Sequence, residues 1–150
     1  MRTIYRNIVG GFIFSEDNKL LIGKSHKGGV YANHWIIPGG GVEQDETHMQ
    51  ALVREILEET GLDITNIIVE ELGYGGSGSS EKTLRNTGER VQVEMEFYNF
   101  VVRLPGSADM INVTTEDDFI QPRWIGAGEI SSIVLSPPTI VTLKKIGYIN

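Results

Sequence analysis

The residues with the clearest capacity for chemistry are three acids near the middle of the chain. Glu58 and Glu59 follow Glu55 by three and four positions, so an α-helix would direct the three carboxylates toward a common point. Like charges at these spacings destabilise a helix unless a cation compensates them, and carboxylate oxygens suit Mg²⁺ or Mn²⁺. Arg54 can pair with one carboxylate and orient it, but it cannot neutralise three. The spacing therefore predicts a divalent-metal site.

Acidic charge is concentrated around these residues. Residues 43–59 contain six acids and one base, a local charge of −5, which leaves −2 for the rest of a chain with net charge −7. The simpler interpretation of such a run is a solvated helix face. A Pro-Gly-Gly-Gly sequence at residues 38–41 favours a binding site instead, because glycine lets backbone approach a ligand closely.

The segment that carries these acids has the pattern of a helix that packs on a core. Apolar side chains recur on the opposite face at near-helical spacing, at Met49, Leu52, Val53 and Ile56. We expect the helix to begin at Asp45 or Glu46 and to end at Gly61. The carboxylates would then point outward from a docked helix.

Residues 40–62 resemble the Nudix box of MutT-like hydrolases, G-x5-E-x7-R-E-U-x-E-E-x-G-U, where U is apolar. The match holds at every defined position, namely Gly40, Glu46, Arg54, Glu55, Ile56, Glu58, Glu59, Gly61 and Leu62. The box is entered through W-x-x-P-G-G at residues 35–40, and R-W-I-x-x-x-E-I at residues 123–130 resembles a late feature of such domains. The resemblance extends in outline over most of the chain.

The resemblance implies a metal-dependent hydrolase. It would cleave the diphosphate linkage of a nucleoside diphosphate derivative, such as a dNTP, a nucleotide sugar or ADP-ribose, by water attack at phosphorus. Glu55, Glu58 and Glu59 are carried over as catalytic residues and, with the Gly39 carbonyl, as ligands of Mg²⁺ or alternatively Mn²⁺. Arg54 is carried over as their orienting partner.

The remaining box positions have supporting roles. Gly40 and Gly61 are expected to be structural. For Glu46 two interpretations stay open: a supporting contact near the metal, or an acid at the helix N-terminus favoured by the helix dipole.

Substrate-binding candidates outside the box are weaker, and each has an ordinary surface or core alternative. They are Lys24, Trp35, Glu94, Glu96 and Asp118, the last grouped with Glu116 and Asp117. The box does not fix the general base, and these acids are candidates for it. Gln121 stands three residues before Trp124, where relatives often have an acid.

Hydrophobic periodicity and turn residues predict the elements that would position the box. We expect a hairpin over residues 4–23, a short strand at 35–37, and further strands at 64–74, 91–103 and 121–125. Residues 75–90, rich in Gly, Ser and Thr, are expected to form a long loop, and prolines at 137 and 138 to open a helix ending near 146. This is an α/β pattern, and the resemblance implies a Nudix-type α/β/α sandwich with a mixed sheet.

Composition limits the class of protein. A chain of 150 residues with 40% hydrophobic content fits a single domain over residues 1–150. Without cysteine there is no thiol nucleophile and no disulfide framework, which fits a cytoplasmic location. No apolar run is long enough to span a bilayer.

Net charge and box integrity limit the partners. The acidic balance argues against stable nucleic-acid binding and weakens an RNA-decapping role, so the expected partner is a small nucleoside diphosphate derivative. A homodimer remains an open alternative to a monomer. The alternative function is a non-catalytic sensor of nucleotide or ADP-ribose on the same fold, and the intact box glutamates favour the hydrolase.

Overall fold

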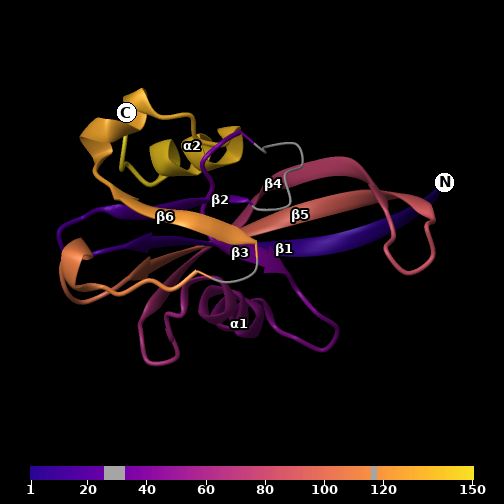
Figure 1. Cartoon of the computed structure of the whole chain (residues 1–150), viewed down its shortest axis with the longest axis horizontal. Helices are drawn as coiled ribbons and strands as arrows, with labels where there is room; N and C mark the ends of the chain where they lie inside the picture. The colour runs from indigo at the N-terminus through magenta and orange to yellow at the C-terminus, as the bar shows by residue number, and fades with distance from the viewer. Residues whose placement is uncertain (26–32, 116–117) are drawn as a thin grey trace.

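A mixed β-sheet runs through the molecule, with α1 on one face and α2 on the other (Figure 1). The computed structural model describes residues 1–25, 33–115 and 118–150. Within them the strands are β1 (Arg2–Phe14), β2 (Leu20–Ser25), β3 (Gly39–Gly41), β4 (Val69–Thr83), β5 (Arg90–Arg103) and β6 (Phe119–Ile125). The helices are α1 (His48–Thr60) and α2 (Pro137–Lys145), with 3-10 turns η1 (Ala108–Met110) and η2 (Ala127–Ser132). The expected α/β/α sandwich is confirmed.

Strand β1 lies at the centre of the sheet, whose order is β4-β5-β1-β2-β6 with β3 also paired to β1. It runs parallel to β5 along its whole length and antiparallel to β2 and β3. The predicted hairpin is confirmed as β1–β2, with Asn18 at a φ of 61° in its turn. One parallel pair among antiparallel ones makes the sheet mixed, as expected.

The two faces of β1 supply two separate cores. Because successive side chains of a strand point to opposite faces, Val9 and Ile13 join the cluster under α1, whereas Phe12 and Phe14 join the cluster under α2. Leu52 and Ile56 of α1 are fully buried in the first cluster, and Leu143 of α2 in the second. Both helices are therefore fixed to the sheet by apolar contacts.

Helix α1 begins later than the sequence suggested. Its N-cap is Thr47, whose side chain accepts a hydrogen bond from the Gln50 N–H while the Gln50 side chain accepts one from the Thr47 N–H. This capping box satisfies two helix-end donors and outcompetes the acids at 45 and 46. Met49 is 38% exposed and lies off the buried face, whereas Gly61 ends the helix at a φ of 73°, as expected.

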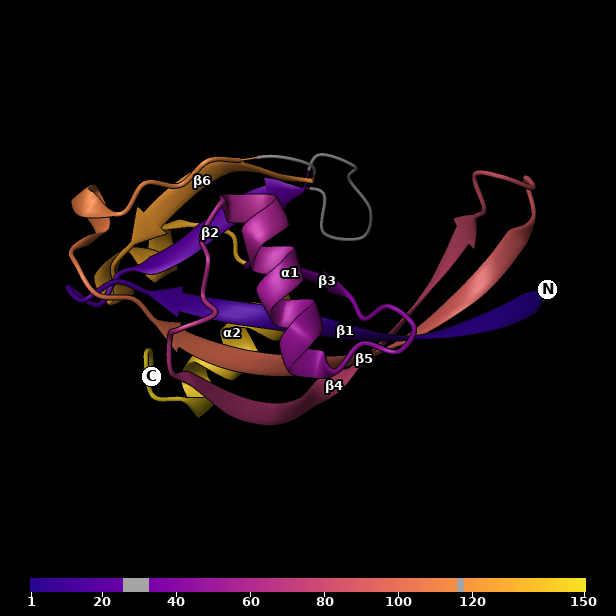
Figure 2. The same ribbon diagram turned by 90° about the horizontal axis from the view of Figure 1, so that it is seen from below.

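The largest correction concerns residues 64–90. The strand expected at 64–74 begins only at Val69, and the expected loop at 75–90 is mostly strand: β4 continues to Thr83 and pairs with β5. Irregular pairing on either side of Tyr74 lets β4 follow the twist of β5. Residues 2–7, 77–83 and 90–96 together form a three-stranded arm that extends beyond the helices (Figure 2).

The segment before the box also differs from its prediction. Trp35 and Ile36 make only isolated bridges, to Leu135 and Gly23, and the strand falls on Gly39–Gly41 instead. The strand expected at 121–125 is confirmed and starts at Phe119, and the C-terminal helix is confirmed as α2. No helix in the described ranges is long and apolar enough to cross a membrane.

Candidate active site

The site is built around β3, a strand of three glycines lying against β1. Gly40 faces α1, and a Cβ on it would overlap the carboxylate of Glu55. A Cβ on Gly39 would overlap the backbone carbonyl of Val9. The absence of a side chain on Gly40 therefore lets the Glu55 carboxylate of α1 lie against the strand backbone.

Arg54 ties α1 to this strand. Its Nη1 donates to Glu55 at 2.9 Å and its Nη2 to the Gly41 carbonyl at 2.9 Å. Glu58 lies farther from Nη1, at 3.4 Å, and Glu43 at 3.7 Å. The hydrogen bond to Glu46, as the largest cause, and that to Glu55 raise the pKa of Arg54 above its ordinary value. The orienting role expected for Arg54 agrees with this geometry.

Glu46 is the closest partner of Arg54. Its carboxylate accepts from Nε at 2.7 Å and from Nη2 at 2.9 Å, and it also accepts from the Glu43 N–H at 2.9 Å. These hydrogen bonds, that of Arg54 first, lower the pKa of Glu46 to about 2. Since α1 starts after Thr47, Glu46 lies outside the first turn of the helix, and its hydrogen bonds favour the interpretation as a supporting contact. Glu46 positions Arg54.

The three box carboxylates do not converge as the spacing suggested. Glu55 and Glu58 both turn toward Arg54, and Glu59 is 5% exposed. Across the part of the chain that the structure describes, no three His, Cys, Asp or Glu side chains are arranged to hold a metal ion. The Arg54 Nη1 therefore lies between the carboxylates of Glu55 and Glu58.

The residues nevertheless fit a hard divalent cation in their chemistry. Carboxylate and backbone carbonyl oxygens are the donors that Mg²⁺ prefers. The Glu55 carboxylate lies in the cradle that a Cβ at Gly40 would fill. The Glu58 side chain is 48% exposed, so it can turn from Arg54 toward a cation without leaving a core.

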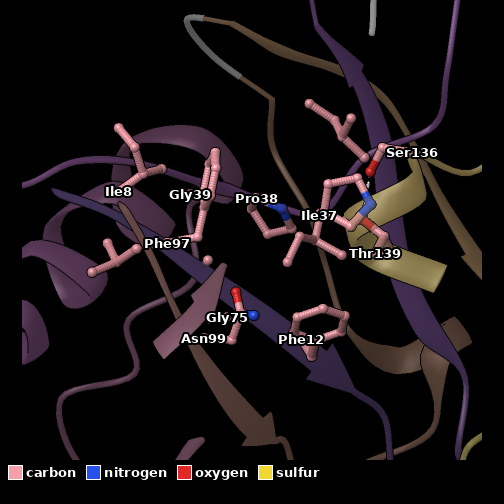
Figure 3. Close-up of a pocket in the computed structure, with 14 residues that line it drawn as sticks. Ile8, Phe12, Ile37, Pro38, Gly39, Gly75, Phe97, Asn99, Ser136 and Thr139 are labelled. Carbon is pink, nitrogen blue, oxygen red and sulfur yellow. Dashed lines mark hydrogen bonds between the residues drawn. The ribbon is translucent and has the colours of Figure 1, made fainter. Parts of the chain in front are cut away.

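A cavity of about 230 Å³ lies on the other face of the sheet, between β1, β5 and α2 (Figure 3). Its walls are mainly apolar, with Ile8, Phe12, Ile37 and Phe97 among them. Gly39 of β3 also lines it, so the cavity borders the site. The cavity can hold the organic part of a ligand close to β3.

Asn99 supplies an amide in this otherwise apolar wall. Its Nδ2 donates to Thr142 Oγ1 of α2 at 3.2 Å and lies against Gly75, where a Cβ would overlap it. Its Oδ1 lies on the side of Gly10, another lining residue. Sequence reasoning missed Asn99, although it interrupts the apolar alternation of Val93, Met95 and Phe97 and that interruption could have identified it.

Lys24 and Trp35 are brought together as a pair. Lys24 Nζ lies 4.9 Å from the centre of the Trp35 ring, and the Arg123 guanidinium lies 5.7 Å from the same ring. Arg123 also pairs with Glu129 at 3.4 Å. The cavity is lined by Ile36, the residue after Trp35, but not by Lys24, Trp35 or Arg123.

The other acids predicted for substrate binding are engaged elsewhere. Glu94 accepts hydrogen bonds from Ser79 and Gln92 on the arm. Glu96 accepts one from the Tyr98 hydroxyl at 3.1 Å, which raises the pKa of Tyr98. Asp118 comes directly before β6, and residues 116 and 117 lie outside the described residues. In the part of the chain that the structure describes, Glu94 and Glu96 are thus bonded to residues of β4 and β5 and not to Arg54.

Comparison with known proteins decides the family. A family model described as NUDIX domain matches residues 4–143. The chain belongs to the Nudix family. RNA pyrophosphohydrolases of Rickettsia canadensis and Rickettsia typhi are each 33% identical to it over 135 residues, which cover 87% of this chain and 81% of theirs.

Solved structures share the fold at lower identity. The MutT protein from Methanosarcina mazei Go1 aligns with a TM-score of 0.65 and 20% identity, covering 97% of this chain and 94% of that one. The E. coli dihydroneopterin triphosphate pyrophosphohydrolase aligns with a TM-score of 0.64 and 17% identity, covering 89% and 90%. The chain is thus a Nudix pyrophosphohydrolase, an enzyme that acts on pyrophosphate bonds.

Proposed function

We propose that this Nudix enzyme hydrolyses the diphosphate linkage of a nucleoside diphosphate derivative by water attack at phosphorus, with Mg²⁺ or Mn²⁺ as cofactor. The observation that supports this most directly is the contact of the Glu55 carboxylate with the glycine strand β3, fixed by Arg54. Nudix hydrolases generally use a divalent metal, and the oxygen donors at this contact suit one.

The chain's own residues have distinct roles in this proposal. Glu55, Glu58 and Glu59, with the Gly39 carbonyl, would hold the ion. A bound divalent cation lowers the pKa of an attacking water and offsets the charge of the phosphoryl oxygens. Arg54 keeps α1 and β3 at a fixed separation, since it donates to Glu55 on the helix and to the Gly41 carbonyl on the strand.

The cavity beside Gly39 is proposed to hold the organic part of the substrate. It is small and mainly apolar, as sites for a flat ring system are, and Asn99 provides a polar contact within it. A dNTP, a nucleotide sugar and ADP-ribose all carry such a ring. The diphosphate would then extend past Gly39 toward the box.

A 5′-triphosphorylated RNA end is a second candidate substrate. The curated relatives at 33% identity are RNA pyrophosphohydrolases, and this favours an RNA end more than the net charge of −7 suggested. Such a substrate needs only its first nucleotides to reach the site, so it requires no extended basic surface. A cytoplasmic location and a monomeric or homodimeric state accompany the proposal as further expectations.

The test is a substrate panel with and without EDTA. We expect Mg²⁺-dependent release of a nucleoside monophosphate or of pyrophosphate from at least one of dNTPs, ADP-ribose, nucleotide sugars, NADH, dinucleoside polyphosphates and triphosphorylated RNA. Turnover of RNA alone would choose the second candidate. No turnover at saturating Mg²⁺ would instead favour the sensor function.

Replacement of one proposed metal ligand sharpens the test. Glu58→Gln should lower kcat roughly 100-fold or more while hardly changing the melting temperature, because an exposed ion pair contributes only about 0–1 kcal/mol. Glu81→Gln is the matched control, since Glu81 is 54% exposed and paired with Arg90 at 3.1 Å, far along the arm. Equal activity of the two variants would contradict the role of Glu58.

A further inference from the structure

Arg6 of β1 lies directly over the glycine strand. Its side chain is on the same face of the sheet as those of Ile8 and Phe12, two residues that line the cavity. A Cβ on Gly41 would overlap the Arg6 Nη2. The guanidinium therefore lies against the backbone of Gly41, next to the box. A side chain of any residue other than glycine at position 41 would fill this space.

Gly41 contacts a second guanidinium, but the two arginines differ in their partners. Arg54 donates to the Gly41 carbonyl at 2.9 Å and is already engaged by acids of the box. Within the described ranges, Arg6 takes part in no ion pair and no side-chain hydrogen bond, whereas Arg2 on the same strand pairs with Glu89 at 2.9 Å. The positive charge of Arg6 is thus available to a ligand.

The glycine strand separates this charge from the box acids. Gly40 faces α1 and the Glu55 carboxylate, whereas Gly39 and Gly41 face the cavity and Arg6. Arg6 stands two positions before Ile8 on the same face of β1, a spacing of roughly 7 Å along a strand. If the ring of a ligand fills the cavity, a group that is separated from this ring by one phosphate or one sugar would reach Arg6.

We propose that Arg6 contacts the substrate by binding a phosphate oxygen at β3. This rests on the proposed function, since the phosphate is that of the diphosphate substrate. A guanidinium offers paired N–H donors that match two phosphate oxygens. Arg6 would offset phosphate charge from the cavity side of β3 while the box acts from the other side.

The test is binding of inorganic pyrophosphate in the presence of Mg²⁺, measured by titration calorimetry. Arg6→Gln should weaken binding roughly 10- to 100-fold, as expected for loss of a charged hydrogen bond. Arg6→Lys should restore part of it, because charge returns without the paired donors. Arg2→Gln is the matched control: it removes the same charge from the same face of β1 and should bind as the wild type does.

The outcomes separate this proposal from the proposed function. Equal pyrophosphate affinity of Arg6→Gln and Arg2→Gln, or no binding by the wild type, would overturn the role of Arg6. If the wild type and Arg6→Gln hydrolyse a substrate with the same KM, the role of Arg6 is also overturned, but the proposed hydrolase function is kept. If Arg6→Gln loses pyrophosphate binding but the wild type turns over no substrate, the role of Arg6 in binding is supported and the hydrolase function is rejected.

Discussion

The contact between Gly40 and Glu55 gives the most direct test of the site. A methyl group at residue 40 would fall on the Glu55 carboxylate, which Arg54 holds from the other side at 2.9 Å. To regain an ordinary van der Waals separation the carboxylate must move by about 1 Å. Gly40→Ala therefore displaces one proposed metal ligand without removing it.

The effects on stability and on activity should differ in size. Overpacking costs about 1–3 kcal/mol, and replacing glycine returns about 0.4–1 kcal/mol by restricting the unfolded chain. The net loss should stay below about 2.5 kcal/mol, because the overlapped atoms are the movable end of a side chain. A displacement of about 1 Å at a reacting group can cost on the order of 100-fold in rate, so kcat should fall by about that factor.

The assay compares kcat and urea unfolding for the wild type, Gly40→Ala and a control. Gly128→Ala is suited to this purpose, because a Cβ on Gly128 meets nothing within 4 Å and its φ is not in the left-handed region. The control should keep full activity and equal or slightly higher stability. If Gly40→Ala also keeps wild-type kcat, the placement of Glu55 against β3 is not needed for catalysis.

Two further predictions concern α1 and its approach. The pKa of Glu46 is lowered from 4.5 to about 2, so ionised Glu46 stabilises the fold above pH 4.5 and this stabilisation is lost as the pH falls toward 2. Between these pH values the melting temperature should therefore drop more steeply for the wild type than for Glu46→Gln. Equal slopes for the two proteins would contradict this contribution of Glu46. Ile56 is fully buried, so Ile56→Ala should lower the free energy of unfolding, measured by urea titration, by about 2–5 kcal/mol. Leu57 on the same helix is 48% exposed, so Leu57→Ala should change this free energy by about 0.5 kcal/mol or less.

The sequence was most informative where one short segment carried the whole signal. Helix α1, its end at Gly61 and the pairing of Arg54 with a carboxylate of the box depend on neighbours within a few turns, so spacing alone predicted them. The N-cap was missed because Asp45 and Thr47 are both good caps, and only the reciprocal bond with Gln50 distinguishes them.

Features that depend on distant partners were not predictable in this way. Residues 75–83 have the composition of a loop, yet they form a strand because β5 offers them a row of backbone partners. Arg6 and Asn99 are single polar residues in strands, and their importance depends on glycines at positions 41 and 75 that are far away in sequence. The role of Glu46 likewise required the position of the Arg54 guanidinium in space.

The pairing of β1 with β5 also determines the order in which this chain can fold. Arg2 pairs with Val91 and Phe14 with Arg103, so every partner across this parallel ladder lies 89 residues away (91 − 2 = 103 − 14). During synthesis from the N-terminus, β1 cannot complete its pairing with β5 until Arg103 has been made. Both cores contain residues of β1 and of β5, so neither core is complete before that step, and folding is expected to be slower than for a sheet of local hairpins.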